Sequence, residues 1–365
     1  MFDFETFLNA EPYSLDHRAK GALLGGALWD LTRWHYDHCE SYRRILDRLE
    51  IDPVKGSDER MIERLPFLPV PLFKTQELRS IPKDQVFKTL TSSGTTGQAV
   101  SRIFLDKETT VLQQKVLVKI VSSFTGAARM PMLIIDSPSV IKNRLMFSAR
   151  GAGILGFSIF GADRTYALND GMQIDFAAIE AFLERHKGRR ILLFGFTFMI
   201  WQYFYKELVK TAEAGRKIDL SLGILIHGGG WKKLIGEAVS PAEFRDRLTA
   251  VCGLSDVHDY YGMVEQTGTV YMQCEKGHLH APIFSDVLIR RGRDFSLCEC
   301  GEKGIVQVVS MLPRSYPGHS LLTQDEGVIL GEDDCACGRK GKYFKILGRL
   351  KNAEIRGCSD TFERK

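Results

Sequence analysis

Apolar and polar positions along the chain predict a helical start followed by alternating strands and helices. Between Ser14 and Leu49, apolar residues recur mostly at helical spacing, and Ser14 and Asp16 offer a capped start. Apolar runs typical of buried strands occupy residues 132–136, 191–196 and 222–227. Helical patterns cover residues 175–187 and the segment that Ser240 opens. This alternation predicts an α/β fold of mixed sheets flanked by helices.

Two other stretches break the alternation. Residues 65–74 contain prolines every few positions, which excludes a helix and predicts an extended connector. After about Gln266 the chain changes to short apolar segments, such as 305–310, that Gly, Pro and paired Cys residues interrupt. This change predicts a smaller β-rich subdomain near the C-terminus. We therefore expect a helical segment with its connector at 1–75, an α/β body at 76–265, a β-rich subdomain at 266–348 and a tail at 349–365.

Charge and composition exclude several classes of protein. The 49 basic and 45 acidic residues give a net charge of +4, which provides little support for binding nucleic acid. No run of about 18 apolar residues is present, so we expect no transmembrane segment, and the acidic start differs from a secretory signal. These features predict a cytoplasmic protein, whose eight cysteines are thiols or metal ligands rather than disulfides.

A cluster of hydroxyl groups and glycines begins at Thr91. Its further members are Ser92, Ser93, Gly94, Thr95, Thr96 and Gly97. Glycine lets the backbone approach a polyanion, and N–H and hydroxyl groups donate hydrogen bonds to phosphate oxygens. The string lacks the Gly-Lys-Ser/Thr of a Walker loop, so it is either a phosphate loop of another class or a polar surface turn.

This string resembles the hydroxyl-rich phosphate loop of the adenylate-forming superfamily, and further motifs of that family follow in the expected order. Tyr260, Tyr261 and Gly262 begin a segment similar to the family's aromatic-Gly-x-x-Glu motif, which ends at Glu265. The resemblance implies that an aromatic ring stacks on adenine and that Glu265 holds Mg²⁺ against the phosphates of ATP. Val264 stands where the family usually has Thr, which puts one hydroxyl contact in doubt.

Three shorter motifs extend the resemblance. Gly228 and Gly229 follow an apolar strand and resemble the glycine-rich turn beneath the adenine ring, although a plain strand-to-helix turn would contain the same residues. Asp325 stands where the family has an Asp that accepts hydrogen bonds from the ribose hydroxyls. Residues 348–351 resemble the hinge motif, whose Arg349 also reaches the ribose.

The hinge motif lies close to the end of this sequence. Only fourteen residues follow Lys351, so we expect the C-terminal domain of the superfamily, with its catalytic Lys, to be missing. Another cation must then stabilise the charge that develops during the reaction, and Lys351, Arg349 and His227 are the candidates.

Three strings narrow the subgroup: SYPGHSLLTQDEGVI, DDCACGRKGKYFKILGR and EIRGCSD. They closely resemble the acyl-protein synthetases of bacterial luminescence operons (LuxE type), and the similarity covers nearly the whole chain. It implies an adenylate-forming enzyme that uses ATP and Mg²⁺ to activate a long-chain fatty acid. It also implies transfer of the acyl group to a protein thiol, for which we favour Cys358 in the polar tail, and delivery to an acyl reductase partner.

Two other functions stay open at this point. A CoA ligase of the phenylacetate-CoA ligase type would release a small thioester, but it would lack the domain that ordinarily completes the thiol-acceptor site. A catalytically silent scaffold subunit would not need an intact phosphate loop together with Glu265, Asp325 and Arg349. The sequence does not specify the acyl chain length, an aromatic or aliphatic acid, or a homo-oligomeric state.

Cysteine and histidine residues cluster in the β-rich part of the chain. They are Cys274, His278, His280, the pair Cys298 and Cys300, and the pair Cys335 and Cys337. Their sulfur and nitrogen atoms suffice for a tetrahedral, structural Zn²⁺ site, and reduced thiols in Gly-rich turns are the alternative. The resemblance to phenylacetate-CoA ligases favours Cys274, one of the two His, Cys335 and Cys337, and a four-cysteine site is the other arrangement.

Overall fold

The computed structural model describes residues 4–54, 61–92, 100–142 and 149–350, and the chain forms two compact units. Unit 1 contains the described residues of 1–123, 262–272 and 278–354, and unit 2 contains those of 124–261 and 273–277. Several predicted site residues lie outside the described residues: Ser93, Gly94, Thr95, Thr96, Gly97, Lys351 and Cys358. The domain boundaries drawn from the sequence stay a prediction.

Unit 1 begins with helices whose ends follow local capping chemistry. They are α1 (Phe4–Asn9), α2 (His17–His38) and α3 (Glu40–Arg48). The carboxylate of Asp16 accepts a hydrogen bond from the backbone N–H of Ala19 at 2.9 Å, which starts α2 at the predicted cap. The helix expected over 14–49 is present, but extended backbone at Cys39 divides it into α2 and α3.

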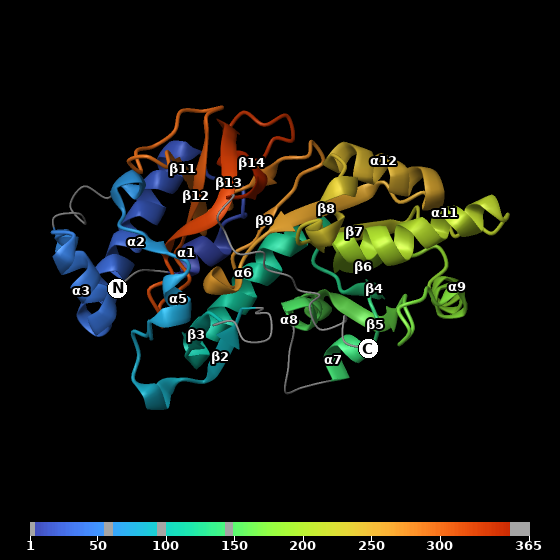
Figure 1. The fold of residues 1–365 in the computed structure, drawn as a ribbon, viewed down its shortest axis with the longest axis horizontal. Coiled ribbons are helices and arrows are strands. Elements are labelled where there is room, and N and C mark those ends of the chain that lie inside the picture. The colour runs from blue at the N-terminus through green and yellow to red at the C-terminus, as the bar shows by residue number, and fades with distance from the viewer. Residues whose placement is uncertain (1–3, 55–60, 93–99, 143–148, 351–365) are drawn as a thin grey trace. The chain divides into compact units, whose positions relative to one another are not determined.

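The body of unit 1 is an antiparallel sheet in the order β10-β14-β13-β12-β11. Its strands are β10 (Leu279–His280), β11 (Ser285–Arg290), β12 (Lys303–Ser310), β13 (Ser320–Glu332) and β14 (Lys342–Arg349). Figure 1 shows β11 to β14 side by side in the orange and red part of the chain. These strands confirm the β-rich part that we expected after Gln266.

The proline-rich connector is only partly extended. Residues Leu68–Pro69 form β1, which runs parallel to β13 and pairs Leu68 with Leu321. The prediction that residues 65–74 contain no helix is wrong, because Leu72–Thr75 forms a one-turn helix, α5, beyond the last proline. Pro71 stands at the N-cap of α5, where its missing N–H costs no hydrogen bond within the helix.

A hairpin and a long helix complete unit 1. The hairpin consists of β2 (Lys88–Thr91) and β3 (Arg102–Leu105), and it pairs Thr91 with Arg102. Helix α6 (Lys107–Thr125) follows directly. Short 3₁₀ segments are η1 (Ile62–Arg64), η2 (Lys83–Gln85) and η6 (Val264–Gln266).

Unit 2 is built on five parallel strands in the order β5-β4-β6-β7-β8. They are β4 (Met130–Ile135), β5 (Gly161–Tyr166), β6 (Ile191–Phe196), β7 (Gly223–Gly228) and β8 (Asp256–Tyr261). The three apolar runs in the sequence predicted β4, β6 and β7 closely. Since β4 pairs with β5 on one side and with β6 on the other, the strand order reverses between β4 and β6. The carboxyl ends of these two strands form a topological switch point, where open α/β sheets bind ligands.

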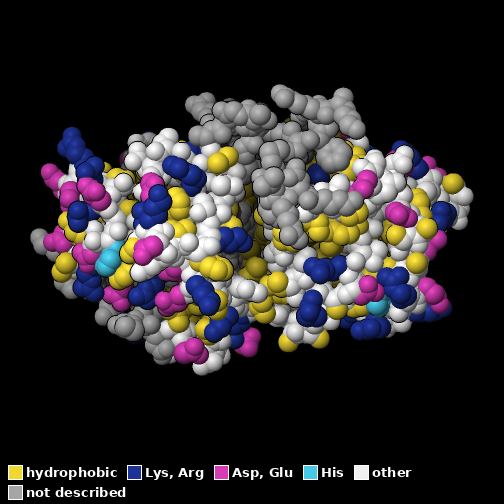
Figure 2. Space-filling model, turned by 90° about the horizontal axis from the view of Figure 1, so that it is seen from below, with side chains coloured by type: hydrophobic (Ala, Val, Ile, Leu, Met, Phe, Trp, Pro, Cys, Tyr) yellow, Lys and Arg dark blue, Asp and Glu magenta, His cyan; other side chains and the backbone are white. Residues whose placement is uncertain are grey.

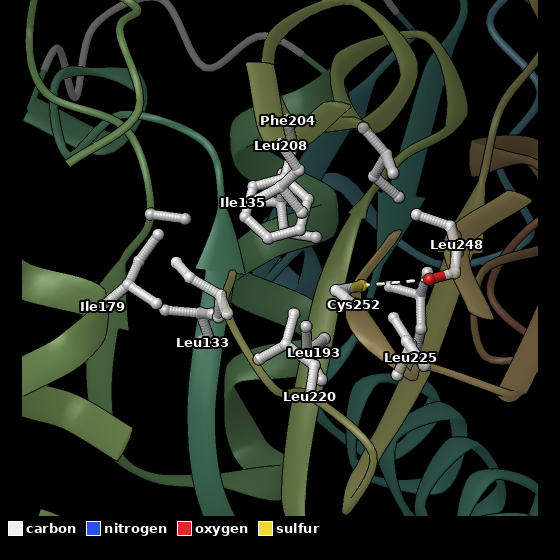
Figure 3. Packing of buried hydrophobic residues seen from close by; sticks show 14 of the residues in the cluster. Leu133, Ile135, Ile179, Leu193, Phe204, Leu208, Leu220, Leu225, Leu248 and Cys252 are labelled. Atoms are coloured by element: carbon white, nitrogen blue, oxygen red, sulfur yellow. Dashed lines mark hydrogen bonds between the residues drawn. The ribbon is translucent and has the colours of Figure 1, made fainter. Parts of the chain in front are cut away.

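Helices cover one face of this sheet and build its core. They are α9 (Phe176–Arg185), α10 (Thr197–Met199), the π-helical η4 (Ile200–Tyr205), α11 (Lys206–Glu213) and α12 (Pro241–Cys252). Figure 3 shows Leu133, Leu193 and Leu225 of the strands gathered with Phe204 and Leu248 of the helices. Each such side chain contributes roughly 1.5–3 kcal/mol on full burial. The shorter elements of unit 2 and its surroundings are α7 (Ser139–Lys142), α8 (Ala149–Phe157), η3 (Ser158–Phe160), η5 (Lys232–Glu237) and β9 (Tyr271–Met272).

The surface and the thiols agree with the composition. No helix in the part of the chain that the structure describes is long and apolar enough to cross a bilayer. On the face drawn in Figure 2, basic, acidic and apolar side chains are interspersed. Among the residues that the structure describes, these cysteines form no disulfide: Cys39, Cys252, Cys274, Cys298, Cys300, Cys335 and Cys337.

Two histidines stack in the interior of unit 1. The rings of His35 and His319 lie 4.9 Å apart, and 0% and 1% of their surfaces are exposed. His35 Nε2 donates to the backbone oxygen of Pro313 at 3.0 Å, so its Nδ1 accepts from the Ser80 hydroxyl at 2.7 Å. Burial lowers the pKa of His35 well below its usual value and the pKa of His319 to about 3. Both rings are therefore neutral in the folded protein.

The stacked histidines predict a loss of stability in mild acid. Unfolded histidines bind protons below about pH 6.5, whereas the folded pair does not, so the stabilising difference is complete above pH 6.5 and decreases as the pH falls towards 3. We expect the free energy of unfolding to fall by about 2 kcal/mol between pH 7 and pH 5 from His319 alone, with a further fall from His35, measured by urea denaturation. The variant His319→Gln should weaken this pH dependence, and His17→Gln, at an exposed helix start, should not. Equal pH dependence in all three proteins would contradict the prediction.

Candidate functional site

Asp325 and Arg349, the two residues expected at the ribose, lie opposite each other on neighbouring strands of unit 1. The register of β13 and β14 pairs them, and Arg349 Nε is 3.5 Å from Asp325 Oδ1. The backbone N–H of Asp325 donates to Thr323 Oγ1 at 3.1 Å. The side chain of Arg349 is 38% exposed, so the ion pair itself adds little stability. An accepting carboxylate beside a donating guanidinium suits a pair of vicinal hydroxyl groups.

Glu265, the predicted Mg²⁺ ligand, lies in η6, and 2% of its surface is exposed. The Tyr316 hydroxyl donates to the backbone oxygen of Glu265 at 3.0 Å. Beside it, Gln266 Nε2 donates to the backbone oxygens of Val308 and Gly318 at 3.1 and 2.9 Å. These contacts lie within unit 1 and hold the segment that carries Glu265.

The structure describes Ser92 from the predicted phosphate loop. Its N–H donates to the backbone oxygen of Ser101 at 3.2 Å, and its hydroxyl accepts from the Ser101 N–H at 2.9 Å. These bonds extend the β2–β3 hairpin by one step, so residues 93–99 connect two paired strands. The roles expected for the rest of the loop, for Lys351 and for Cys358 fall outside the described residues and stay predictions.

An aromatic ring shapes the glycine turn of unit 2. The register of β7 and β8 places Tyr260 beside Gly228, and a Cβ at Gly228 would come within 2.5 Å of Tyr260 Cε1. Gly229 has a φ of +78°, which favours glycine. Tyr261 ends β8, and Gly262 follows as an exposed residue. Glycine is therefore needed at position 228 because the Tyr260 ring packs directly against the backbone there, which the sequence did not reveal.

Further aromatic rings line the same face of the sheet. Phe157 of α8 lies 4.9 Å from Tyr260 and stacks on Phe194 with ring centroids 4.4 Å apart. Phe196 ends β6 at the switch point, and a Cβ at Gly153 of α8 would come within 2.8 Å of its ring. The apolar run over residues 191–196 predicted a buried strand, but nothing in the sequence indicated the part played by Phe157 and Gly153. In the structure Phe194 and Phe196 are buried.

A buried ion pair, also missed by the sequence analysis, lies at the switch point. Arg150 Nε of α8 is 2.9 Å from Asp136 Oδ2 at the end of β4, and both side chains are almost fully buried. Asp136 Oδ1 accepts from the backbone N–H of Ser137 at 2.7 Å. A buried ion pair is seldom a net gain in stability, so its place at the carboxyl edge of the sheet suggests that it shapes the binding end. The one sign of this ion pair in the sequence was Asp136, an acidic residue directly after an apolar strand.

Four of the predicted metal ligands come together. One ligand atom from each of Cys274, His280, Cys335 and Cys337 lies within 4.8 Å of the others. His280 Nε2 is 3.3 Å from Cys337 Sγ, and all but Cys337 are buried. With Zn–S bonds of about 2.3 Å, tetrahedral ligand atoms lie roughly 3.8 Å apart. The spacing and the mixture of nitrogen and sulfur donors therefore fit Zn²⁺.

The other candidate donors lie outside this group. His278 Nδ1 is 3.3 Å from Cys335 Sγ, but His278 is not among the four clustered residues. The thiols of Cys298 and Cys300 donate instead to backbone oxygens of their own neighbourhood, at 3.6 and 3.5 Å. The geometry favours His280 over His278 and the mixed set over four cysteines.

Comparison with known protein families shows which family the chain belongs to. The family model described as acyl-protein synthetase, LuxE, matches residues 3–365. The chain belongs to this family. Membership in the acyl-protein synthetase family confirms the resemblance read from the ordered motifs and the assignment to the ligases.

Two curated relatives align with the greater part of this acyl-protein synthetase family member. Both are named long-chain-fatty-acid–luciferin-component ligase. The protein from Vibrio harveyi is 23% identical over 336 residues, which cover 90% of this chain and 84% of the relative. The protein from Aliivibrio fischeri is 22% identical over 338 residues, with 89% and 84% covered.

Solved structures share the fold. A 2-hydroxyisobutyryl-CoA ligase in its postadenylation state superposes with a TM-score of 0.69 over 93% of this chain and 69% of its own, at 13% identity. The same ligase in a thioesterification state gives a TM-score of 0.69 at 14% identity. This similarity shows that the acyl-protein synthetase family member has the adenylate-forming fold, as the sequence predicted.

The contact between Gly228 and Tyr260 predicts a local loss of stability on adding one methyl group. In Gly228→Ala the new Cβ must displace the Tyr260 ring, which Phe157 restrains on its other side, and overpacking of this kind costs roughly 1–3 kcal/mol. We expect a lower thermal midpoint and weaker ATP binding by calorimetry. Gly230→Ala is the matched control, because no atom lies within 4 Å of a Cβ at that position. Equal midpoints for the two variants would refute the packing argument.

Proposed function

We propose that the protein activates a long-chain fatty acid with ATP and passes the acyl group to a protein thiol. The observation that carries the proposal is the match to the acyl-protein synthetase family over residues 3–365. Both curated relatives are named for ligation of a long-chain fatty acid, and the fold is that of adenylate-forming enzymes. The paired Asp325 and Arg349 and the anchored Glu265 give this chain groups suited to a nucleotide.

In the first step the fatty acid carboxylate attacks the α-phosphorus of ATP. A P–O bond to the acyl group forms, the P–O bond to pyrophosphate breaks, and pyrophosphate leaves with its electron pair. The carboxylate is ionised at neutral pH, so no general base is needed. We assign the positioning of the reactants to residues 92–97, Tyr260, Asp325 and Arg349, and Glu265 would hold Mg²⁺. Mg²⁺, when bound, neutralises phosphate charge and orients the leaving group.

In the second step a thiolate attacks the carbonyl carbon of the acyl-adenylate. The bond to AMP breaks, AMP leaves, and a thioester forms. We assign the acceptor to Cys358, which lies in a polar tail of the sequence, and we assign Lys351 to the charge that develops at the phosphate. The thioester then supplies an acyl reductase, and we place the whole sequence of steps in the cytoplasm.

We also propose a structural Zn²⁺ held by Cys274, His280, Cys335 and Cys337. Four protein ligands would fill the tetrahedral positions of Zn²⁺, so no position would be open for a substrate. The metal would tie the loop between β13 and β14, which carries Cys335 and Cys337, to His280 of the edge strand β10. Its contribution is therefore to stability rather than to the reaction.

Replacing the assigned acceptor separates the two half-reactions. Cys358→Ala should keep the ATP–pyrophosphate exchange that depends on fatty acid, because adenylation does not use the thiol. It should lose the hydroxylamine-labile label that forms on the chain with ATP, Mg²⁺ and labelled fatty acid. Cys300→Ser, at an exposed thiol, is the control and should keep both activities. If the label persists in Cys358→Ala, the acceptor lies elsewhere, and if small CoA thioesters form instead, the protein is a CoA ligase.

The zinc assignment predicts the metal content directly. Protein purified without chelator should contain about one Zn²⁺ per chain, and its removal should lower the thermal midpoint because four ligands lose their common partner. Cys337→Ser should lose most of the metal, whereas Cys300→Ser should retain it. A preparation without metal whose thermal midpoint does not respond to chelator would show that these residues are reduced thiols.

A further inference from the structure

The segment that carries Glu265 cannot hold its own conformation. It is the three-residue 3₁₀ turn η6, and 3₁₀ hydrogen bonds have poorer geometry than those of an α-helix. Gly268, just beyond η6, has a φ of +89°, and a Cβ there would come within 2.7 Å of the Gln113 Cα of α6. The chain therefore passes directly over the backbone of α6. The place of Glu265 depends on contacts from residues distant in sequence.

Tyr316 makes one such contact from the interior of unit 1. Its surface is 0% exposed, and its ring packs edge-on against Phe73 at 6.2 Å. Gly318 lies beneath the ring, and a side chain there would overlap both the ring and the backbone oxygen of Glu265. Because the ring is confined on these sides, its hydroxyl, which also contacts the Gln113 side chain, is directed at the Glu265 oxygen at 3.0 Å.

The direction of this hydrogen bond is fixed by chemistry. A backbone oxygen only accepts, so the tyrosine hydroxyl must donate. Burial raises the pKa of Tyr316, with a further rise from the nearby Glu265, so the hydroxyl keeps its proton. Gln266 adds a second restraint, because its amide nitrogen donates both hydrogens to the backbone of β12 and of the Gly318 turn. Separate hydrogen bonds thus hold the carbonyl group of Glu265 and the side chain of the next residue, Gln266.

We propose that Tyr316 is a positioning residue for the adenylation reaction, whose hydroxyl orients the Glu265 peptide and, through it, the carboxylate that receives Mg²⁺. This inference rests on the proposed role of Glu265. Mg²⁺ requires nearly ideal octahedral geometry at about 2.0–2.1 Å, so a small rotation of the Glu265 peptide weakens the metal contact. Misplacement by about 1 Å can reduce a rate about 10²-fold, and loss of one positioning bond should cost less.

The test removes one hydroxyl group. In Tyr316→Phe we expect ATP–pyrophosphate exchange to fall about tenfold at low Mg²⁺ and to recover partly as Mg²⁺ is raised, because a weakened metal site needs a higher concentration. Tyr271→Phe is the matched control. The Tyr271 hydroxyl is also buried in unit 1 and also donates to a backbone oxygen at 3.0 Å, but that oxygen belongs to Asp286. The two variants should lose similar amounts of thermal stability, and Tyr316→Phe alone should change the Mg²⁺ dependence.

A double variant distinguishes positioning from a general structural effect. Tyr316→Phe should reduce exchange in the parent protein but have no further effect in Glu265→Gln, since the group that it orients is then absent. An equal reduction in both backgrounds would overturn the inference, as would matching Mg²⁺ profiles for Tyr316→Phe and Tyr271→Phe. If Glu265→Gln itself exchanged pyrophosphate like the parent protein, the role of Glu265 would fail and the inference with it. If Glu265→Gln were impaired and Tyr316→Phe were unaffected, the proposed adenylation activity would stand and only the positioning role of Tyr316 would be overturned.

Discussion

Strand β13 pairs with β12 on one side and with β14 on the other, and the placement of Asp325 and Arg349 in unit 1 depends on this pairing. On one side, Thr323 Oγ1 donates to the backbone oxygen of Val306 in β12 at 2.8 Å, and the same oxygen atom of Thr323 accepts from the Asp325 N–H. On the other side, the register with β14 sets Arg349 opposite Asp325. A slip of one residue would turn Asp325 to the opposite face of the sheet, because side chains alternate along a strand. The contact between Asp325 and Arg349 is therefore a consequence of strand register.

A buried cluster of charges restrains the same sheet. Asp286 of β11 accepts from Lys20 of α2 at 3.2 Å and from Lys342 at the start of β14 at 2.8 Å. Burial alone would raise the pKa of Asp286, but the two lysines outweigh it and lower this pKa to about 2. Removing one member of a buried pair leaves an uncompensated charge, which costs about 3–5 kcal/mol. The cluster thus favours the one arrangement in which α2, β11 and β14 meet.

Much of this structure follows from local sequence, and the rest depends on contacts between distant segments. Apolar runs located three of the five parallel strands of unit 2, and Ser240 starts α12 as its side chain suggested, accepting from the Glu243 N–H at 3.2 Å. Motif order was sufficient to expect Asp325 and Arg349 at one place, since the resemblance assigns both residues to the ribose, and the structure pairs them. The reason for Gly228 could not be read from the sequence, because the obstructing ring belongs to Tyr260 on the next strand. The ion pair of unit 2 and the tyrosine contact to Glu265 escaped notice for the same reason.

The hairpin formed by β13 and β14 has charged side chains at one end and cysteine thiols at the other. Asp325 and Arg349 lie at its open end, and Cys335 and Cys337 lie in the turn that joins the strands. Eight residues of β14 at about 3.3 Å each separate these ends by roughly 25 Å. Hairpins open first at the end away from their turn, so the contact between Asp325 and Arg349 lies where this hairpin opens most readily. The pairing of β13 with β12 therefore supports the Asp325 end, where the turn is too far away to do so.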